Sequence, residues 1–378
     1  MPKNAVRSKR RDLLKGALAL AGTVIAAPRP GAAAAEPSPT RDAGLIGREN
    51  AKPGAIDWQL TYVRLDSPTG YRSPGIEGYC SRQSVAAGES IDFMVSADPP
   101  GQFTIDVFRM GYYGGRGARL MTTLGPLAGK PQPMPPVGPR RVRECRWAPA
   151  ATLTVPADWP SGVYLGRLSR VPAGDGRDPW QSYTVFIVRD ERPADILFQC
   201  SDNTWQAYNR WPDQFSLYDN GLTPDWTSLS GIDVSFDRPY GKYRQIYENP
   251  QSVGSGEFLC WEFPLAFWLE QQGYDVTYCS QSDMLSPERG KKCKVFISVG
   301  HDEYWDRRAH DAVAAMRDAG VNLLFLSGNT LCWVTPFGPS SDGRPNRVIT
   351  RAAPYKGPTM GANRCAIRSR TSGPTKGS

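Results

Sequence analysis

This chain of 378 residues has few histidines and lacks the Cys-x-x-Cys pairs that are common in metalloproteins. It has only two histidines, His301 and His310, and none of its eight cysteines forms a Cys-x-x-Cys pair. Zinc ribbons and thioredoxin-like redox proteins depend on such pairs, so the sequence excludes both classes. Because histidine is so scarce, a histidine that follows a buried strand is a candidate for a functional role.

Long apolar runs are missing as well, which bears on the amino terminus. The mildly apolar stretch Gly16–Ala27 is too short and too rich in Ala and Gly to predict a membrane span. It follows Ser8-Lys-Arg-Arg-Asp-Leu-Leu-Lys15, which resembles a twin-arginine export signal, and small residues at 31–35 offer a cleavage site. We therefore predict a signal peptide over residues 1–35 and a periplasmic or secreted protein; an uncleaved amino-terminal anchor is the alternative.

The chain carries little excess charge outside this signal. Its net charge is +8, but residues 1–35 contain seven Lys and Arg and one Asp, so +6 lies in this segment and +2 remains. No basic patch with interleaved aromatic residues stands out in the remainder. We therefore expect no nucleic-acid partner.

The cysteines allow two interpretations in an oxidising compartment. Cys80 and Cys145 are a candidate disulfide, and the alternative is that both are free and buried. Cys200, Cys293 and Cys332 lie in or beside apolar strand patterns, which is typical of thiols in a hydrophobic core.

The chain is long enough for two domains. Residues 36–55 are rich in Pro, Gly and Ala and indicate a linker. From 56 to 190, short alternating segments separated by turn residues predict an immunoglobulin-like antiparallel β-sandwich. The clearest of these strands are Ser90–Ser96, Phe103–Arg109, Val163–Leu168 and Ser182–Val188.

From 191 to 355 the pattern changes to strands that alternate with helices. This alternation predicts a parallel sheet with helices on both faces. The predicted strands are Ile196–Cys200, Val276–Cys279, Val295–Val299 and Val321–Leu326, and the helices are Phe263–Glu270 and Asp306–Ala319. The basic tail 356–378 has no acidic residue, and we expect it to be disordered or to follow a truncated or shifted reading frame.

Polar residues follow three of these strands directly. They are Ser201–Asn209, His301–Trp305 and Ser327–Asn329. Ligands of open α/β sheets bind outside the carboxyl ends of the strands, where all three segments would meet. The sequence therefore predicts a functional site at this edge.

Several of these segments together resemble one protein family, the N,N-dimethylformamidase large (beta) subunit and its relatives. The resemblance covers roughly residues 56–355. It rests on Phe108–Gly114, Trp205–Asn209, Ser235–Tyr240, Gly300–Trp305 and Leu326–Asn329. It implies that the second domain is similar to class I glutamine amidotransferases, with a flavodoxin-like α/β fold but without their cysteine nucleophile.

The resemblance also implies a mononuclear ferric iron held by two tyrosinates and one glutamate. The glutamate corresponds to Glu303 and the first tyrosine to Tyr208. The second tyrosine is Tyr240, with Tyr243 and Tyr218 as competitors because this stretch aligns less surely.

The same resemblance implies that His301 and Glu303 are catalytic, and that His301 lies beside the metal, where it transfers protons or supports a ligand. From the residues themselves, Asn203 and Asn329 are candidates for orienting the substrate. Each residue also has a plainer interpretation. Glu303 can cap the following helix, His301 can bond to backbone, Tyr208 can simply pack in the core, and both asparagines can close turns.

The sequence thus favours an exported iron-dependent amidohydrolase that cleaves an amide-like or formamide-like C–N bond of a small molecule. A second hypothesis is a non-catalytic cell-surface protein that binds carbohydrate or peptide. A third is a hydrolase of the same fold with another metal or none. A homo-oligomer stays open, as does the small partner subunit with which the formamidase works.

Overall fold

A computed structural model describes residues 44–63, 70–172, 179–221, 231–241 and 252–354, which belong to one compact unit. The predictions for the signal peptide 1–35, for Tyr243 and for the tail 356–378 lie outside these residues. Within the described part, no helix has the length and apolar character needed to cross a membrane.

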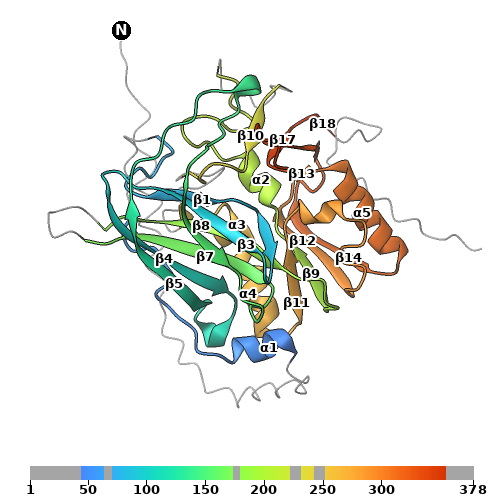
Figure 1. Cartoon of the computed structure of the whole chain (residues 1–378). Coiled ribbons are helices and arrows are strands. Elements are labelled where there is room, and N and C mark those ends of the chain that lie inside the picture. The colour runs from blue at the N-terminus through green and yellow to red at the C-terminus, as the bar shows by residue number, and fades with distance from the viewer. Residues whose placement is uncertain (1–43, 64–69, 173–178, 222–230, 242–251, 355–378) are drawn as a thin grey trace, which may run out of the picture. The chain divides into compact units, whose positions relative to one another are not determined.

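The first half of the described chain forms two β-sheets that share a core, as predicted for the all-β part (Figure 1). Side chains of both sheets, such as Phe93 and Tyr164, pack in one buried cluster. Neighbouring strands are antiparallel except β2 and β8. The first sheet has the order β1 (Glu77–Cys80), β3 (Ser90–Ser96), β6 (Pro149–Thr154), and the second has the order β2 (Ser84–Ala86), β8 (Gln181–Arg189), β7 (Gly162–Arg170), β4 (Gly101–Met110), β5 (Ala118–Gly129).

The second half is built on a parallel sheet. Every neighbouring pair of its strands is parallel, and α5 lies beside β12 and β14 in Figure 1. The strand order is β11 (Val276–Cys279), β9 (Ile196–Gln199), β12 (Val295–His301), β14 (Asn322–Gly328), and the two longest helices are α4 (Phe263–Gln271) and α5 (Arg307–Asp318).

Different helices cover the two faces of this sheet. Successive side chains of a strand point to opposite faces, so the packing partners of neighbouring residues show which helix lies on which face. Phe198 and Ile297 pack in the same cluster as α4, whereas Leu197 and Phe296 pack in the cluster that contains α5. The predicted alternation of strands and helices is therefore confirmed.

The two halves share a hydrophobic core. Phe108, Leu165 and Ile187 of the five-stranded sheet belong to the same cluster as α4. A fully buried ion pair crosses the same boundary, since Arg109 of β4 donates to Glu270 of α4 at 2.8 Å. The five-stranded sheet thus packs on the α4 side of the parallel sheet.

Part of the predicted linker is structured. Leu45–Asn50 forms helix α1, in which Ile46 and Glu49 are buried. Glu49 accepts hydrogen bonds from Tyr113 at 2.9 Å and from Arg119 at 2.7 Å. The helix could not be predicted from the low hydrophobicity of this segment. Contacts of the buried Glu49 carboxylate with a hydroxyl and a cationic side chain hold it in place instead.

Cys80 and Cys145 are both buried and free, which matches the second interpretation of the cysteines.

The remaining elements are short. They are α2 (Asp202–Ala207), α3 (Phe258–Trp261), β10 (Asp233–Ser235), β13 (Tyr304–Trp305), β15 (Trp333–Val334), β16 (Phe337–Gly338), β17 (Val348–Thr350), β18 (Ala353–Pro354) and the 3-10 turns η1 (Tyr113–Gly115), η2 (Pro139–Arg141) and η4 (Asp283–Leu285).

Candidate functional site

The candidate site lies beyond the carboxyl ends of β9 and β12. These neighbouring strands mark the point where the strand order reverses, because β11 follows β9 in the chain but lies on its other side. Such a reversal opens a crevice in a parallel sheet. Two of the predicted polar segments, 201–209 and 301–305, start from these strand ends.

Glu303 is the centre of a hydrogen-bonded cluster of buried and half-buried side chains. The Tyr208 hydroxyl donates to its Oε2 at 2.6 Å, and the Trp333 indole N–H donates to its Oε1 at 2.9 Å. Asp306, not Glu303, caps α5, since its carboxylate accepts from the Arg308 backbone N–H at 2.8 Å. The helix-cap interpretation of Glu303 therefore does not describe its contacts.

Gly300 directs the chain into this cluster. Its φ is +77°, and a Cβ placed on it would lie 2.6 Å from Cβ of Trp261 on α3. Only glycine adopts this conformation without strain and fits against the helix. The turn places His301 and Glu303 on the site at the end of β12.

Three phenol hydroxyls meet beside Glu303. Tyr208 and Tyr218 are 3.0 Å apart at their oxygens, and their rings stack with centroids 5.0 Å apart. The Tyr218 hydroxyl also contacts the Tyr304 hydroxyl. Tyr208 follows α2, Tyr218 lies in the loop after it, and Tyr304 belongs to β13. Tyr208 thus bonds to Glu303, and Tyr218 and Tyr304 extend this contact as a chain of hydroxyls.

These phenols are held in their neutral form within the protein. Burial raises the pKa of Tyr208, Tyr218 and Tyr304, and the nearby charge of Glu303 raises the pKa of each further. The charge of Arg351 acts in the opposite direction on the pKa of Tyr218. A bound cation would favour the phenolate forms and can replace their protons.

His301 shares its Nε2 between two neighbours. This nitrogen lies 3.2 Å from Glu303 Oε2 and 3.0 Å from Asn329 Nδ2. It can donate to the carboxylate or accept from the amide, but a single ring nitrogen does not do both at once. Asn329 has a φ of +50°, so it closes a turn as well as contacting His301.

Asn203 has a structural contact. Its amide donates to the Tyr304 backbone carbonyl at 3.1 Å, and the side chain is fully buried. It therefore holds the backbone that carries Tyr304.

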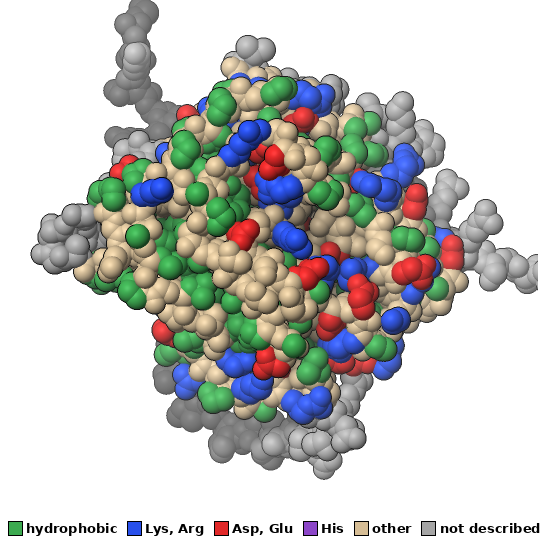
Figure 2. All heavy atoms as spheres, viewed as in Figure 1, with side chains coloured by type: hydrophobic (Ala, Val, Ile, Leu, Met, Phe, Trp, Pro, Cys, Tyr) green, Lys and Arg blue, Asp and Glu red, His purple; other side chains and the backbone are tan. Residues whose placement is uncertain are grey.

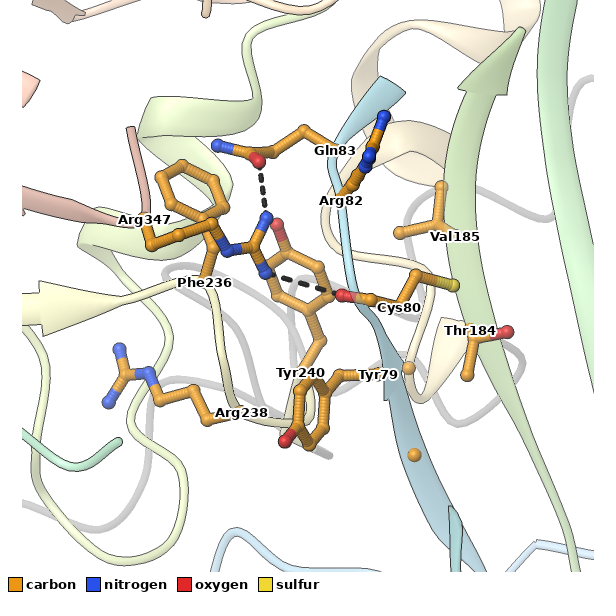
Figure 3. A pocket seen from close by; sticks show the side chains of 12 residues that line it. Tyr79, Cys80, Arg82, Gln83, Thr184, Val185, Phe236, Arg238, Tyr240 and Arg347 are labelled. Carbon is orange, nitrogen blue, oxygen red and sulfur yellow. Dashed lines mark hydrogen bonds between the residues drawn. The ribbon is translucent and has the colours of Figure 1, made fainter. Parts of the chain in front are cut away.

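Tyr240 lies in a different place from Glu303. It packs edge-on against Trp205 with centroids 6.3 Å apart and lines a cavity between β1, β8 and the segment around Phe236 (Figure 3). On the cavity wall, Arg347 donates to Gln83 and to the Cys80 carbonyl. The structure therefore brings Tyr218, rather than Tyr240, to Tyr208 and Glu303.

The Ser235–Tyr240 motif has a structural role that the sequence did not reveal. Arg238 is buried and donates to the Gln206 side chain, to the Gln206 carbonyl at 3.3 Å and to the Asn209 carbonyl at 2.9 Å. It also donates to the carbonyls of Trp211 and Phe215, each at 2.9 Å. One guanidinium thus organises the segment that carries Tyr208 and Tyr218.

A buried carboxyl lies directly beneath the site. Asp302 accepts from Gln199 and Ser298, each at 2.7 Å, and from Gln281. Burial raises its pKa to about 7, and burial raises that of neighbouring Asp202 to about 8. This layer could not be predicted from the sequence, because Gln199 of β9 and Gln281, which follows β11, are distant from Asp302 along the chain.

Conventional metal ligands are not gathered here. Across the described ranges, no group of three or more His, Cys, Asp and Glu is arranged to hold a metal ion. The cluster instead combines phenols with one carboxylate and one imidazole. A metal at this place would be bound mainly through tyrosine oxygen.

The sequence comparisons agree with these motifs. The model of the family "N,N-dimethylformamidase beta subunit-like, C-terminal" matches residues 104–370, which is most of the chain. No curated protein matches the chain. The chain belongs to the N,N-dimethylformamidase beta subunit-like family.

Proposed function

We propose that this protein is a hydrolase that cleaves an amide-like or formamide-like C–N bond of a small molecule. The observation that supports this most is the convergence of Tyr208, Tyr218 and Glu303, whose oxygens are linked by contacts of 2.6 and 3.0 Å. The family match supports the same class of activity.

We propose that these three residues hold a mononuclear ferric iron. Phenolate and carboxylate oxygens are hard anionic donors, which suit this ion. The Tyr208 hydroxyl lies 3.0 Å from that of Tyr218 and 2.6 Å from Glu303 Oε2, so the three donors are close enough to share one metal ion. When bound, iron would act as a Lewis acid on an amide carbonyl.

The protein's own residues supply the proton transfer. His301 touches Glu303 and Asn329 through Nε2, and it is the histidine that the sequence places at a strand end. An imidazole in this position can take up a proton and give it to a leaving amine. Trp333 fixes the orientation of Glu303 by its hydrogen bond.

Four finer assignments accompany this proposal. The strand order with a reversal at β9 and β12 supports a flavodoxin-like fold of the class I glutamine amidotransferase type. The two-sheet core supports an immunoglobulin-like sandwich. Basic and acidic side chains are interspersed on the face in Figure 2, which supports a small-molecule substrate over nucleic acid. The twin-arginine pattern supports export.

The proposal is tested by iron content and visible absorption of the purified full-length protein. We expect one iron per chain and a tyrosinate-to-ferric charge-transfer band. Tyr208→Phe should remove or strongly weaken the band, and Glu303→Ala should remove the iron. Tyr62→Phe is a suitable control, because Tyr62 is exposed and lies outside the site.

A folded protein without iron and without the band would contradict this proposal. The non-catalytic binding protein would then be the better account. Amide hydrolysis that persists after complete removal of iron would instead support the third hypothesis.

A further inference from the structure

Arg351 is a buried cation next to the site that no part of the proposed chemistry uses. It lies between β17 and β18, and its side chain is only 2% exposed. The next residue, Ala352, donates its N–H to the Val334 carbonyl at 3.0 Å, which ties this segment to β15. The backbone therefore holds Arg351 against the strand that carries Trp333.

The Arg351 guanidinium lies over two aromatic rings. Its central carbon is 4.5 Å from the ring centroid of Tyr218 and 4.7 Å from that of Trp333. A planar guanidinium stacks on aromatic faces, and the attraction between cation and ring strengthens when water is excluded. The geometry thus couples the positions of these two rings.

One ring belongs to a proposed iron ligand, Tyr218, and the other, Trp333, contacts a proposed ligand directly. The Trp333 indole donates to Glu303, and the Tyr218 hydroxyl bonds to Tyr208. These contacts approach the cluster from two different elements, β15 and the loop after α2. A displacement of Arg351 would therefore be passed to ligands on both sides of the cluster.

We infer that Arg351 is a positioning residue, whose guanidinium bridges Tyr218 and Trp333 and thereby fixes the oxygens of Tyr208, Tyr218 and Glu303 around one point. This inference rests on the proposed function, because that point is the one assigned to iron. It assigns a role to a residue of the β17–β18 segment, which is distant in sequence from every proposed ligand.

The test is the rate at which a strong chelator extracts iron from purified full-length variants, followed by the charge-transfer band. Arg351→Ala should lose iron about tenfold faster or more, since a factor of ten corresponds to about 1.4 kcal/mol, within the range of a buried cation–π contact. Its band should also shift, because the phenol oxygens are less well held. Arg351→Lys should restore little, since lysine lacks the planar group.

Chemical rescue separates positioning from loss of folding. Millimolar guanidinium should slow iron loss from Arg351→Ala by occupying the vacated space, whereas urea of the same shape but without charge should not. Arg344→Ala is the matched control, because Arg344 pairs with Asp237 and Asp342 rather than with a site tyrosine. It should retain iron as the unaltered protein does.

The outcomes distinguish the two proposals. If the unaltered protein holds no iron, both the proposed function and this inference are overturned. If it holds iron and Arg351→Ala retains it equally well, only the role of Arg351 is overturned. Faster iron loss that guanidinium does not slow in a folded variant also contradicts this role.

Discussion

At the scale of single residues, one carboxylate organises the site. Glu303 receives hydrogen bonds from Tyr208 and Trp333 and lies 3.2 Å from His301, so its oxygens are fixed from three directions. Each partner comes from a different element. Such convergence fixes geometry at the expense of burying charge and polar groups, which is typical of functional sites.

The buried carboxyl of Asp302 gives a prediction about pH. Its pKa is raised to about 7, against about 3.9 for a solvated aspartate, and that of Asp202 to about 8. The folded protein therefore keeps protons that the unfolded chain has released. The stability that these groups contribute is present below about pH 4 and is lost as pH rises through 7 to 8.

Asp302→Asn tests this directly, since it keeps the shape and removes the ionisation. We expect the melting temperature of the variant to fall less between pH 5 and 8 than that of the unaltered protein. Asp311→Asn on the exposed side of α5 is the control. Equal pH dependence in all three proteins would show that Asp302 does not titrate in this range.

At the scale of elements, some strands could be predicted closely, whereas the longest, β5, was not predicted. Ser90–Ser96 and Val276–Cys279 match β3 and β11 residue for residue, because their apolar residues alternate or run continuously between polar turns. The two-residue strands β13, β15 and β18 could not be predicted. A pair of residues has no period, and their register comes from contacts distant in sequence.

The site was predictable in part for the same reason. Glu303, His301 and Tyr208 follow strands and could be placed at one sheet edge from sequence alone. The choice between Tyr218 and Tyr240 could not be made, because both follow irregular loops whose path depends on Arg238. Tyr304 was missed although it adjoins Glu303, because a strand would have turned it to the opposite face.

Arg238 gives a prediction at this scale. Its guanidinium donates five hydrogen bonds, four to backbone carbonyls and one to the Gln206 side chain. A lysine in its place has only three N–H donors for these five acceptors. Buried acceptors left without donors cost about 1–3 kcal/mol each. Two acceptors would lose their donor, so we expect Arg238→Lys to lower the free energy of unfolding by about 2–6 kcal/mol in urea titrations.

The matched control is Arg140→Lys. Arg140 pairs with Asp233 on the surface, where such a pair contributes about 0–1 kcal/mol. A similar small loss for both variants would show that Arg238 does not organise the loop.

At the scale of the whole molecule, the two halves form a single folding unit. They share the hydrophobic cluster around α4, and the Arg109–Glu270 pair joins them with both side chains fully buried. Tyr278 donates to the same carboxylate at 3.0 Å, and Asn50 of α1 donates to it at 2.9 Å. We therefore expect one unfolding transition for the described part of the chain.

Removing one partner of this pair should destabilise both halves together. Arg109→Met leaves Glu270 buried without its cation, which costs about 3–5 kcal/mol. The double variant Arg109→Met, Glu270→Leu should recover part of that loss, since no charge remains buried. Calorimetry that shows two separate transitions, or a shift in only one of them, would contradict a shared core.

We propose that Tyr208, Tyr218 and Glu303 form one iron centre. The most direct measurement is resonance Raman and absorption spectroscopy of the iron-loaded protein, with Tyr218→Phe compared with Tyr240→Phe. We expect Tyr218→Phe to shift the tyrosinate band and weaken its Raman modes, and Tyr240→Phe to leave both unchanged. Loss of the band in Tyr240→Phe with an unaltered band in Tyr218→Phe would contradict it.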